Sequence, residues 1–205
     1  LSHNYLSEDQ AAAVKLAAAN PLVVITGGPG CGKTTVIRAL VNLFQRAGLI
    51  IKLAAPTGRA AQRMAEVTGA EASTIHRMLK YDPYERDFYH CAKHPLELDV
   101  LIVDESSMID LELASSLFDA LEKHVRIIVV GDADQLPSVG PGLFLWDLLS
   151  VPEIPRVCLS KLFRRAEESA ITRIAHDINN NHIPQIPDSN SGATSDAFFV
   201  GVDGP

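Results

Sequence analysis

Short apolar runs alternate along the chain with longer stretches of helical periodicity. The five apolar runs are rich in β-branched residues and span 22–26, 50–54, 100–103, 127–130 and 156–159. Runs of this kind are typical of strands that are buried on both faces of a parallel sheet. Amphipathic helical stretches lie at 7–19, 33–47, 58–68, 111–123 and 167–179. The alternation predicts an α/β fold with a parallel sheet of about five or more strands between layers of helices.

Capping and turn residues indicate where these elements begin and end. Ser7 and Asp110 stand directly before helical stretches as N-caps, and Gly48 follows a helical stretch as a C-terminal stop. Residues 80–98 are rich in Tyr, His, Pro and charge, so we expect a surface insertion there. Leu143 to Leu149 is an apolar stretch that contains the single tryptophan, Trp146, which we expect in the core.

Composition changes after residue 180, where Asn, Pro, Ser, Gly and Asp dominate. We therefore expect one domain over residues 1–182 and a linker over residues 183–205, in which 198–200 would form one more short strand. No apolar run approaches the roughly 20 residues that a membrane span needs. The first ten residues are polar and not basic, unlike a signal peptide. A soluble, cytoplasmic protein without membrane contact is expected.

Charge and cysteine content exclude only a few kinds of protein and site. The net charge is −7, which argues against a protein that coats nucleic acid by bulk charge but leaves room for a locally basic groove. The three cysteines are odd in number and widely spaced, so no disulfide framework is expected. A zinc site at 90–94 would have at most three ligands, with poor spacing for tetrahedral zinc, and a polar surface loop is the better interpretation.

A glycine-rich segment at 27–34 carries the strongest chemical signal. It reads GGPGCGKT, fits G-x-x-x-x-G-K-[ST], and lies between an expected strand and an expected helix. Glycines allow backbone N–H groups to surround a phosphate, and a helix N-terminus adds positive potential. Lys33 is placed to reach the β- and γ-phosphates, and the Thr34 hydroxyl to bind Mg²⁺. ATP and Mg²⁺ are the expected substrate and cofactor.

Two acids follow the third apolar run, and a polar turn follows the fourth. Asp104 at the end of its strand is placed near Mg²⁺, and Glu105 is placed to orient and deprotonate a water molecule. Gln135 is placed to hydrogen-bond the γ-phosphate or that water. The alternative at this turn is that Asp132 and Asp134 only cap it as Asx residues, or join the metal shell.

These residues and several further motifs resemble one known family. The motifs occur in order at 6–10, 27–35, 55–61, 73–76, 103–108, 131–142 and 159–165. Together they are similar to the RecD and TraA branch of the superfamily one DNA helicases, which includes the alpha subunit of exodeoxyribonuclease V. The likeness covers about residues 5 to 182. It implies a RecA-like P-loop fold and the first of two motor domains, so this chain would be one part of a longer protein.

The resemblance implies roles for further residues in nucleotide binding. Gln10 would read the adenine base through its amide, and Arg164 would stabilise charge on the γ-phosphate. The alternative for Gln10 is an exposed helix residue, and the alternative for Arg164 is pairing with Glu167 or Glu168. Arg165 stands where many relatives have Gln. The full set expected to bind ATP is Gln10, Gly28, Pro29, Gly30, Cys31, Gly32, Lys33, Thr34, Thr35, Gln135 and Arg164.

The resemblance also implies contacts to single-stranded DNA. Pro56, Thr57 and Arg59 match a motif that touches the DNA backbone, and Thr74 and His76 match the next DNA-contacting segment. Arg59 has the alternative of a solvated helix charge, and His76 that of a hydrogen-bonded structural histidine. Three functions stay open: an ATP-driven DNA helicase motor, a motor subunit of a nuclease complex, and an ATP-dependent switch that does not translocate. Single-stranded DNA is the expected partner, with nuclease or helicase subunits of a repair complex in the second case.

Overall fold

The computed structural model describes residues 6–161, 169–189 and 195–200. The first half contains α1 (Glu8–Ala19), β1 (Leu22–Thr26), α2 (Lys33–Arg46), β2 (Ile51–Ala55), α3 (Gly58–Thr68), β3 (Ala72–Thr74), α4 (Ile75–Met78), β4 (Tyr81–Asp82) and β5 (Asp87–Phe88). The second half contains β6 (Val100–Val103), the short 3₁₀ helix η1 (Ser106–Met108), α5 (Leu111–Asp119), β7 (Arg126–Gly131), α6 (Phe144–Ser150), β8 (Arg156–Cys158) and α8 (Ala170–Asn179).

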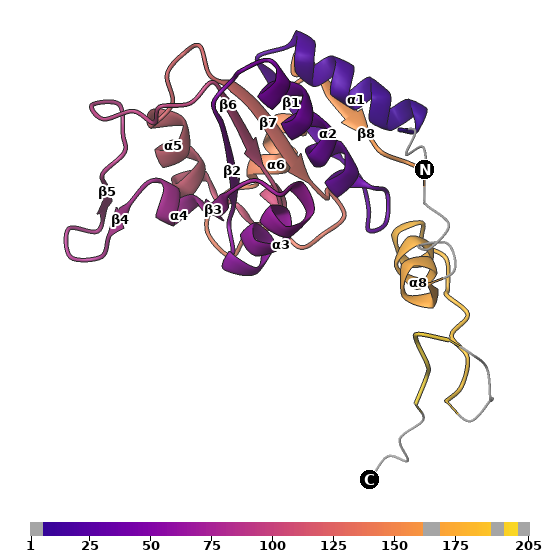
Figure 1. Cartoon of the computed structure of the whole chain (residues 1–205). Coiled ribbons are helices and arrows are strands. Elements are labelled where there is room, and N and C mark those ends of the chain that lie inside the picture. Colours follow the sequence, from indigo (N-terminus) through magenta and orange to yellow (C-terminus); the bar gives the residue numbers. More distant parts are fainter. Residues whose placement is uncertain (1–5, 162–168, 190–194, 201–205) are drawn as a thin grey trace.

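A six-stranded parallel sheet in the order β3-β2-β6-β7-β1-β8 forms the centre of the molecule (Figure 1). All five expected strands are present, so the α/β prediction is confirmed. The edge strand β3 was not predicted, because its three residues, Ala-Ser-Thr, do not form an apolar run. Its pairing with β2 supplies the stabilisation that its own side chains lack.

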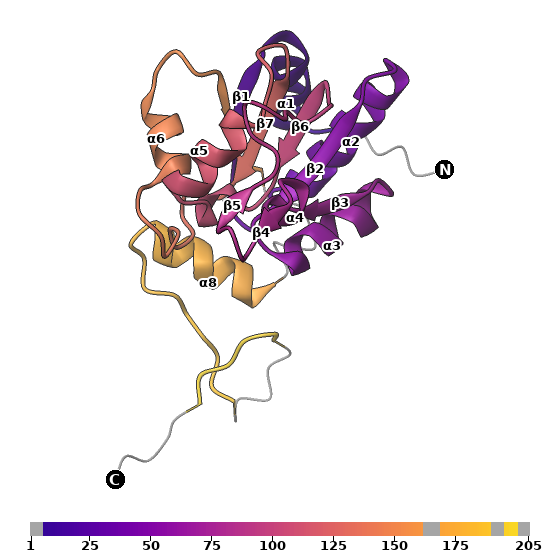
Figure 2. The same cartoon turned by 90° about the vertical axis from the view of Figure 1, so that its left-hand side faces the viewer.

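Alternate residues of the central strands face two separate layers of helices. Val23 and Ile25 of β1 pack with α1, α2 and α3 on one face, whereas Val24 packs with α4, α5 and α6 on the other. β6 and β7 alternate in the same way, which explains why their runs are continuously apolar. Figure 2 shows the two helical layers from the side, with α8 and the chain after it outside them.

Most predicted helix boundaries are confirmed by capping geometry. Ser7 accepts a hydrogen bond from the backbone N–H of Gln10, and Asp110 accepts one from Leu113. Gly48 directly follows the C-cap of α2 with a left-handed φ of +74°. Helix α5 ends at Asp119 rather than near residue 123, because the chain turns towards β7. The part of the stretch 167–179 that the structure describes is helical from Ala170.

The two segments predicted to be irregular differ from each other. Residues 80–98 form a mostly exposed insertion with a short hairpin of β4 and β5, although Leu96 and Leu98 are buried. The strand expected at 198–200 is wrong, since only a single bridge joins Asp188 and Phe199. Trp146 on α6 is half-buried and packs against the hydrophobic layer of α4 and α5. In the part of the chain that the structure describes, no helix is long and apolar enough to cross a membrane.

Candidate functional site

The candidate site lies where the parallel strands end at their carboxyl sides. β1 leads into the phosphate loop, β6 into Asp104 and Glu105, and β7 into Asp132 and the following turn. These three strands are neighbours in the sheet. In open α/β sheets this edge is where ligands bind, because helix N-termini and loop backbones converge there. The sheet order therefore brings together motifs that are about 100 residues apart in sequence.

The backbone of the phosphate loop has a shape that requires glycine. Gly30 and Gly32 have left-handed φ values of +79° and +81°. A Cβ on Gly27 would lie 2.8 Å from the carbonyl oxygen of Leu159, so this position has no room for a side chain. Gly32 is the N-cap of α2 and has no side chain that occupies the helix N-terminus. The first N–H groups of α2 therefore point towards the pocket, as an anion-binding helix requires.

Lys33 lies across the mouth of this loop. Its ammonium group donates to the carbonyl oxygens of Gly27 and Gly28, the latter at 3.1 Å, and lies 3.8 Å from a carboxylate oxygen of Asp132. The Lys33 side chain is 14% exposed and that of Asp132 only 2%. The Asp132 carboxylate is thus a buried counter-ion of the lysine, a role that the sequence did not indicate.

The acid pair after β6 is held in an unusual conformation. Glu105 has a left-handed φ of +53°, which a residue with a side chain adopts only at a cost of about 1–3 kcal/mol. Its backbone N–H donates to the Asp104 carboxylate at 2.9 Å. Burial raises the pKa of Asp104 to about 6, helped by the Glu105 charge, while the Glu105 N–H and the positive charges of Lys33 and Arg63 act in the opposite direction. Two adjacent residues therefore combine a strained backbone, at Glu105, with a desolvated carboxylate, at Asp104.

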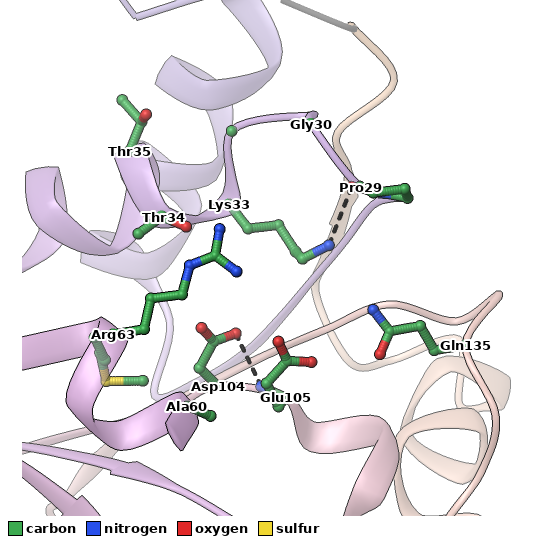
Figure 3. A pocket seen from close by; sticks show the side chains of 13 residues that line it. Pro29, Gly30, Lys33, Thr34, Thr35, Ala60, Arg63, Asp104, Glu105 and Gln135 are labelled. Atoms are coloured by element: carbon green, nitrogen blue, oxygen red, sulfur yellow. Dashed lines mark hydrogen bonds between the residues drawn. The ribbon is translucent and has the colours of Figure 1, made fainter. Parts of the chain in front are cut away.

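The turn after β7 combines both interpretations offered for it. Asp132 accepts a hydrogen bond from the backbone N–H of Asp134 at 3.1 Å, which is the Asx cap. Its other carboxylate oxygen accepts one from the side-chain amide of Gln135 at 3.3 Å. This contact aims the Gln135 side chain towards the acids (Figure 3). Asp132 thus orders the turn and positions Gln135.

A cavity of about 400 Å³ unites these groups. It is lined by Gly28, Pro29, Gly30, Gly32, Lys33, Thr34, Thr35, Ala60, Arg63, Met64, Asp104, Glu105 and Gln135. Ten of the residues predicted from the motifs are in this set. Thr34 and Asp104 offer a hydroxyl and a carboxylate oxygen to the same space, which is the hard-oxygen donor set that suits Mg²⁺.

Two predicted ATP contacts lie beside this cavity. Cys31 is buried and lines an adjoining cavity of about 310 Å³ with Cys158 and α8. Burial raises the pKa of its thiol. Gln10 is 1% exposed rather than a free surface residue, and its amide donates to the Gly32 carbonyl at 3.4 Å and accepts from the Ser7 N–H at 3.0 Å. Gln10 thus braces the phosphate loop, and its adenine contact stays a prediction. Arg164 lies outside the described residues.

The residues predicted to touch DNA follow β2 and β3, at the same sheet edge. The hydroxyls of Thr57 and Thr74 accept hydrogen bonds as N-caps of α3 and α4. Pro56 directly precedes Thr57, and Arg59 on α3 is exposed. His76 is exposed and packs edge-on against Tyr81, with ring centroids 5.7 Å apart. Their DNA contacts stay predictions.

Sequence reasoning missed Arg63, Ala60 and Met64, which line the cavity from α3. The signal was weak, because only the packing of α3 beside α2 brings this helix to the phosphate loop. Residues 90–94 lie in the insertion after α4, where Ala92, Lys93 and His94 are exposed. In the described part of the chain, no group of three or more His, Cys, Asp or Glu side chains is arranged to hold a metal ion.

Comparison with known proteins identifies the family. The model of the AAA domain family matches residues 10–141, which is more than half of the chain. The chain belongs to the AAA domain family. Its predicted resemblance to RecD is also confirmed, by relatives that carry this name.

Two curated relatives give the measure of that resemblance. The chain is 43% identical over 179 residues to the "ATP-dependent RecD2 DNA helicase" of Deinococcus radiodurans, an alignment that covers 87% of this chain and 24% of that protein. It is 40% identical over 166 residues to the "RecBCD enzyme subunit RecD" of Mycolicibacterium smegmatis, covering 69% of this chain and 30% of that one. The chain therefore spans less than a third of the length of either relative.

Solved structures share the fold of this AAA domain. A complex of two coordinating Pif1 helicases at forked DNA matches with a TM-score of 0.63 at 23% identity, covering 87% of this chain and 49% of that one. The Pif1 helicase from Candida albicans matches with a TM-score of 0.62 at 20% identity, covering 88% and 45%. These matches confirm the predicted RecA-like fold.

Proposed function

We propose that this chain is the ATP-binding and ATP-hydrolysing motor domain of a RecD-type helicase that moves along single-stranded DNA. One observation carries the proposal: the phosphate loop, the two acids and Gln135 line a single cavity although they follow three different strands. The AAA domain match and the RecD-named relatives support it. We place the domain at residues 1–182 and the linker at 183–205, in a cytoplasmic protein.

The chemistry follows from the positions of the side chains. Lys33 exchanges its bonds to the Gly27 and Gly28 carbonyls for bonds to phosphate oxygens. Thr34 and Asp104 would hold Mg²⁺, and the ion would supply positive charge that stabilises the charge developing on the phosphates. Glu105 orients a water molecule for in-line attack on the γ-phosphorus and accepts its proton. The bond from the γ-phosphorus to the bridging oxygen breaks, and ADP and phosphate leave.

A motor differs from a nucleotide-dependent switch because its nucleotide and DNA sites are coupled. Pro56 and Thr57 directly precede α3, and Arg59 lies in its first turn. The same helix lines the nucleotide cavity, so one rigid element joins the two proposed sites. This placement favours a motor over a switch that binds ATP without DNA. By linkage, DNA must then bind more tightly in one nucleotide state than in another. The name of the Mycolicibacterium relative makes that protein a subunit of a larger enzyme. Whether the motor proposed here acts alone or beside nuclease subunits is a question about partners.

Fluorescence anisotropy with a labelled oligothymidine tests this function. We expect residues 1–205 to bind the single strand at about 50 mM salt, to lose most affinity by about 200 mM, and to prefer it over a duplex. A non-hydrolysable ATP analogue should shift the affinity, and Arg59→Ala should weaken it. Arg46→Ala, which removes an exposed charge at the far end of α2, is the matched control. Absence of single-strand binding at low salt, or binding that is indifferent to nucleotide, would rule the motor out.

A further inference from the structure

Arg63 is a cation of the nucleotide cavity that no motif accounts for. It lies on α3, between Gln62, which is exposed, and Met64, which is 1% exposed and fixes the buried face of the helix. Figure 3 shows its side chain extending from α3 into the cavity, with the guanidinium group between Thr34 and the acid pair. The charge of the nearby Asp104 carboxylate attracts this cation into the cavity, although no ion pair joins the two side chains.

The contacts of the described residues leave the Arg63 guanidinium available for a ligand. Neither ion pair found in the described part of the chain involves Arg63; they join Lys33 to Asp132 and His124 to Glu122. No hydrogen bond of the Arg63 side chain is present among those residues either. Lys33, by contrast, has three partners, two carbonyls and one carboxylate. The two cations of the cavity therefore differ: one is held within the loop, and the other faces the space where a ligand binds.

The position of Arg63 along the cavity indicates which part of a nucleotide it would meet. Lys33 and Arg63 enter from different helices, α2 and α3, and the acid pair lies beside Arg63 (Figure 3). Glu105 and Gln135 mark the end at which the attacking water belongs, which is the end of the terminal phosphate. A guanidinium group presents a planar fork of donors that matches two phosphate oxygens at once.

We propose that Arg63 binds the terminal phosphate of a nucleoside triphosphate, so that this residue distinguishes a triphosphate from a diphosphate. The inference rests on the proposed function, because it assumes that the cavity binds a nucleotide. It assigns to α3 a contact that is made within this chain, in addition to any arginine from a second motor domain. Loss of the terminal phosphate then removes the ligand of Arg63 while the phosphates held by the loop and Lys33 stay in place.

Equilibrium titration of fluorescent nucleotides tests this assignment. The probes are a non-hydrolysable ATP analogue and ADP, each with Mg²⁺ and each labelled on the ribose. We expect Arg63→Ala to weaken the triphosphate by about tenfold or more and ADP by no more than about twofold, as loss of one charged hydrogen-bonding contact predicts. Arg63→Lys keeps the charge without the fork and should lie between Arg63→Ala and the parent. Arg46→Ala should bind both probes like the parent.

Two further measurements separate the possible failures. Lys33→Ala should weaken both probes, since the lysine serves the phosphates near the loop. Two results would show that the assignment of Arg63 is wrong and that the nucleotide site is right. In the first, Lys33→Ala loses nucleotide binding and Arg63→Ala does not. In the second, Lys33→Ala loses binding and Arg63→Ala weakens the binding of both probes equally. If the parent binds neither probe, both are wrong. Thermal unfolding of each variant, followed by circular dichroism, must match the parent, and Arg63→Lys provides the test if Arg63→Ala does not fold.

Discussion

At the scale of single residues, two acids of the candidate site lower the stability of the folded protein. Glu105 stands in a left-handed conformation, and Asp104 is a desolvated acid next to it. Each feature costs free energy in the folded protein, and both acids line the cavity that we propose as the nucleotide site. The phosphate loop and the acids were predictable from sequence because their spacing carries the chemistry. Arg63 and the pairing of Lys33 with Asp132 were not, since they depend on which helix and which strand lie beside the loop.

Asp104→Asn should stabilise the protein without ligands. The pKa of Asp104 is raised to about 6 from an ordinary value of 3.8, so the folded state holds the proton more tightly than the unfolded state. Ionised Asp104 therefore destabilises the fold progressively as the pH rises from about 4 through 6, and fully above that. Asn carries no charge and still accepts the Glu105 N–H. We expect the variant to be more stable at pH 7.5 by about 1–3 kcal/mol, and the difference to shrink towards pH 4.

Urea unfolding in EDTA, with Asp104→Asn and the parent measured at both pH values, checks this prediction. Asp99→Asn is a poor control because that carboxylate accepts the N–H of Ile50. Asp119→Asn at the end of α5 is a better one, since it removes the same charge far from the cavity. Two results would contradict the prediction: an Asp104→Asn variant that is no more stable than the parent at pH 7.5, or a difference in stability that does not depend on pH. Either would show that ionised Asp104 does not destabilise the fold.

At the scale of elements, the sequence predicted type and order better than it predicted contacts. Four of the five apolar runs became strands with residues in both hydrophobic layers, whereas β8 lies at the sheet edge and contributes only the half-buried Val157 to one layer. β3 was missed because its position at the sheet edge, rather than its composition, makes it a strand. The contact of η1 with the end of β7 was also not predicted from the sequence. There the hydroxyls of Ser106 and Ser107 are buried without a partner among the described residues, and Ser106 packs onto Gly131.

Gly131→Ala should disrupt this contact and destabilise the fold. A Cβ at Gly131 would lie 2.4 Å from the Ser106 hydroxyl and 2.8 Å from a methyl of Leu145. Overpacking of this kind costs about 1–3 kcal/mol. Gly58→Ala is the control, because a Cβ there meets nothing within 4 Å and alanine favours the first turn of α3. Chemical denaturation compares the two variants with the parent.

A double-mutant cycle locates the cause of that destabilisation. Ser106→Ala removes an unpartnered hydroxyl and should itself change stability little. In that background Gly131→Ala should cost less than it does alone, because one of its two close neighbours is gone. Additive effects, or a Gly131→Ala variant as stable as Gly58→Ala, would mean that the end of β7 has more room than the structure gives it.

At the scale of the whole molecule, one sheet edge carries both the proposed nucleotide cavity and the residues predicted to touch DNA. The ends of β1, β7 and β6 form the nucleotide cavity, and the ends of β2 and β3 present the residues predicted to touch DNA. The α/β alternation predicts the parallel sheet, and the resemblance to RecD implies its RecA-like form. The positions of these residues along one edge follow from the strand order, which cannot be read from the sequence. A net charge of −7 is compatible with this arrangement, because binding requires only a local row of donors.

The most direct test of the nucleotide site is the affinity of Mg-ATP for the parent and for Lys33→Ala. Lys33 lies 14% exposed in the phosphate loop, and phosphate oxygens are the acceptors that match its ammonium group. A fluorescent ATP analogue should bind the parent and lose about tenfold or more of its affinity in Lys33→Ala, with thermal unfolding of both proteins at a similar temperature. Equal affinity in two folded proteins would contradict the account of this cavity as the site where ATP is bound and hydrolysed.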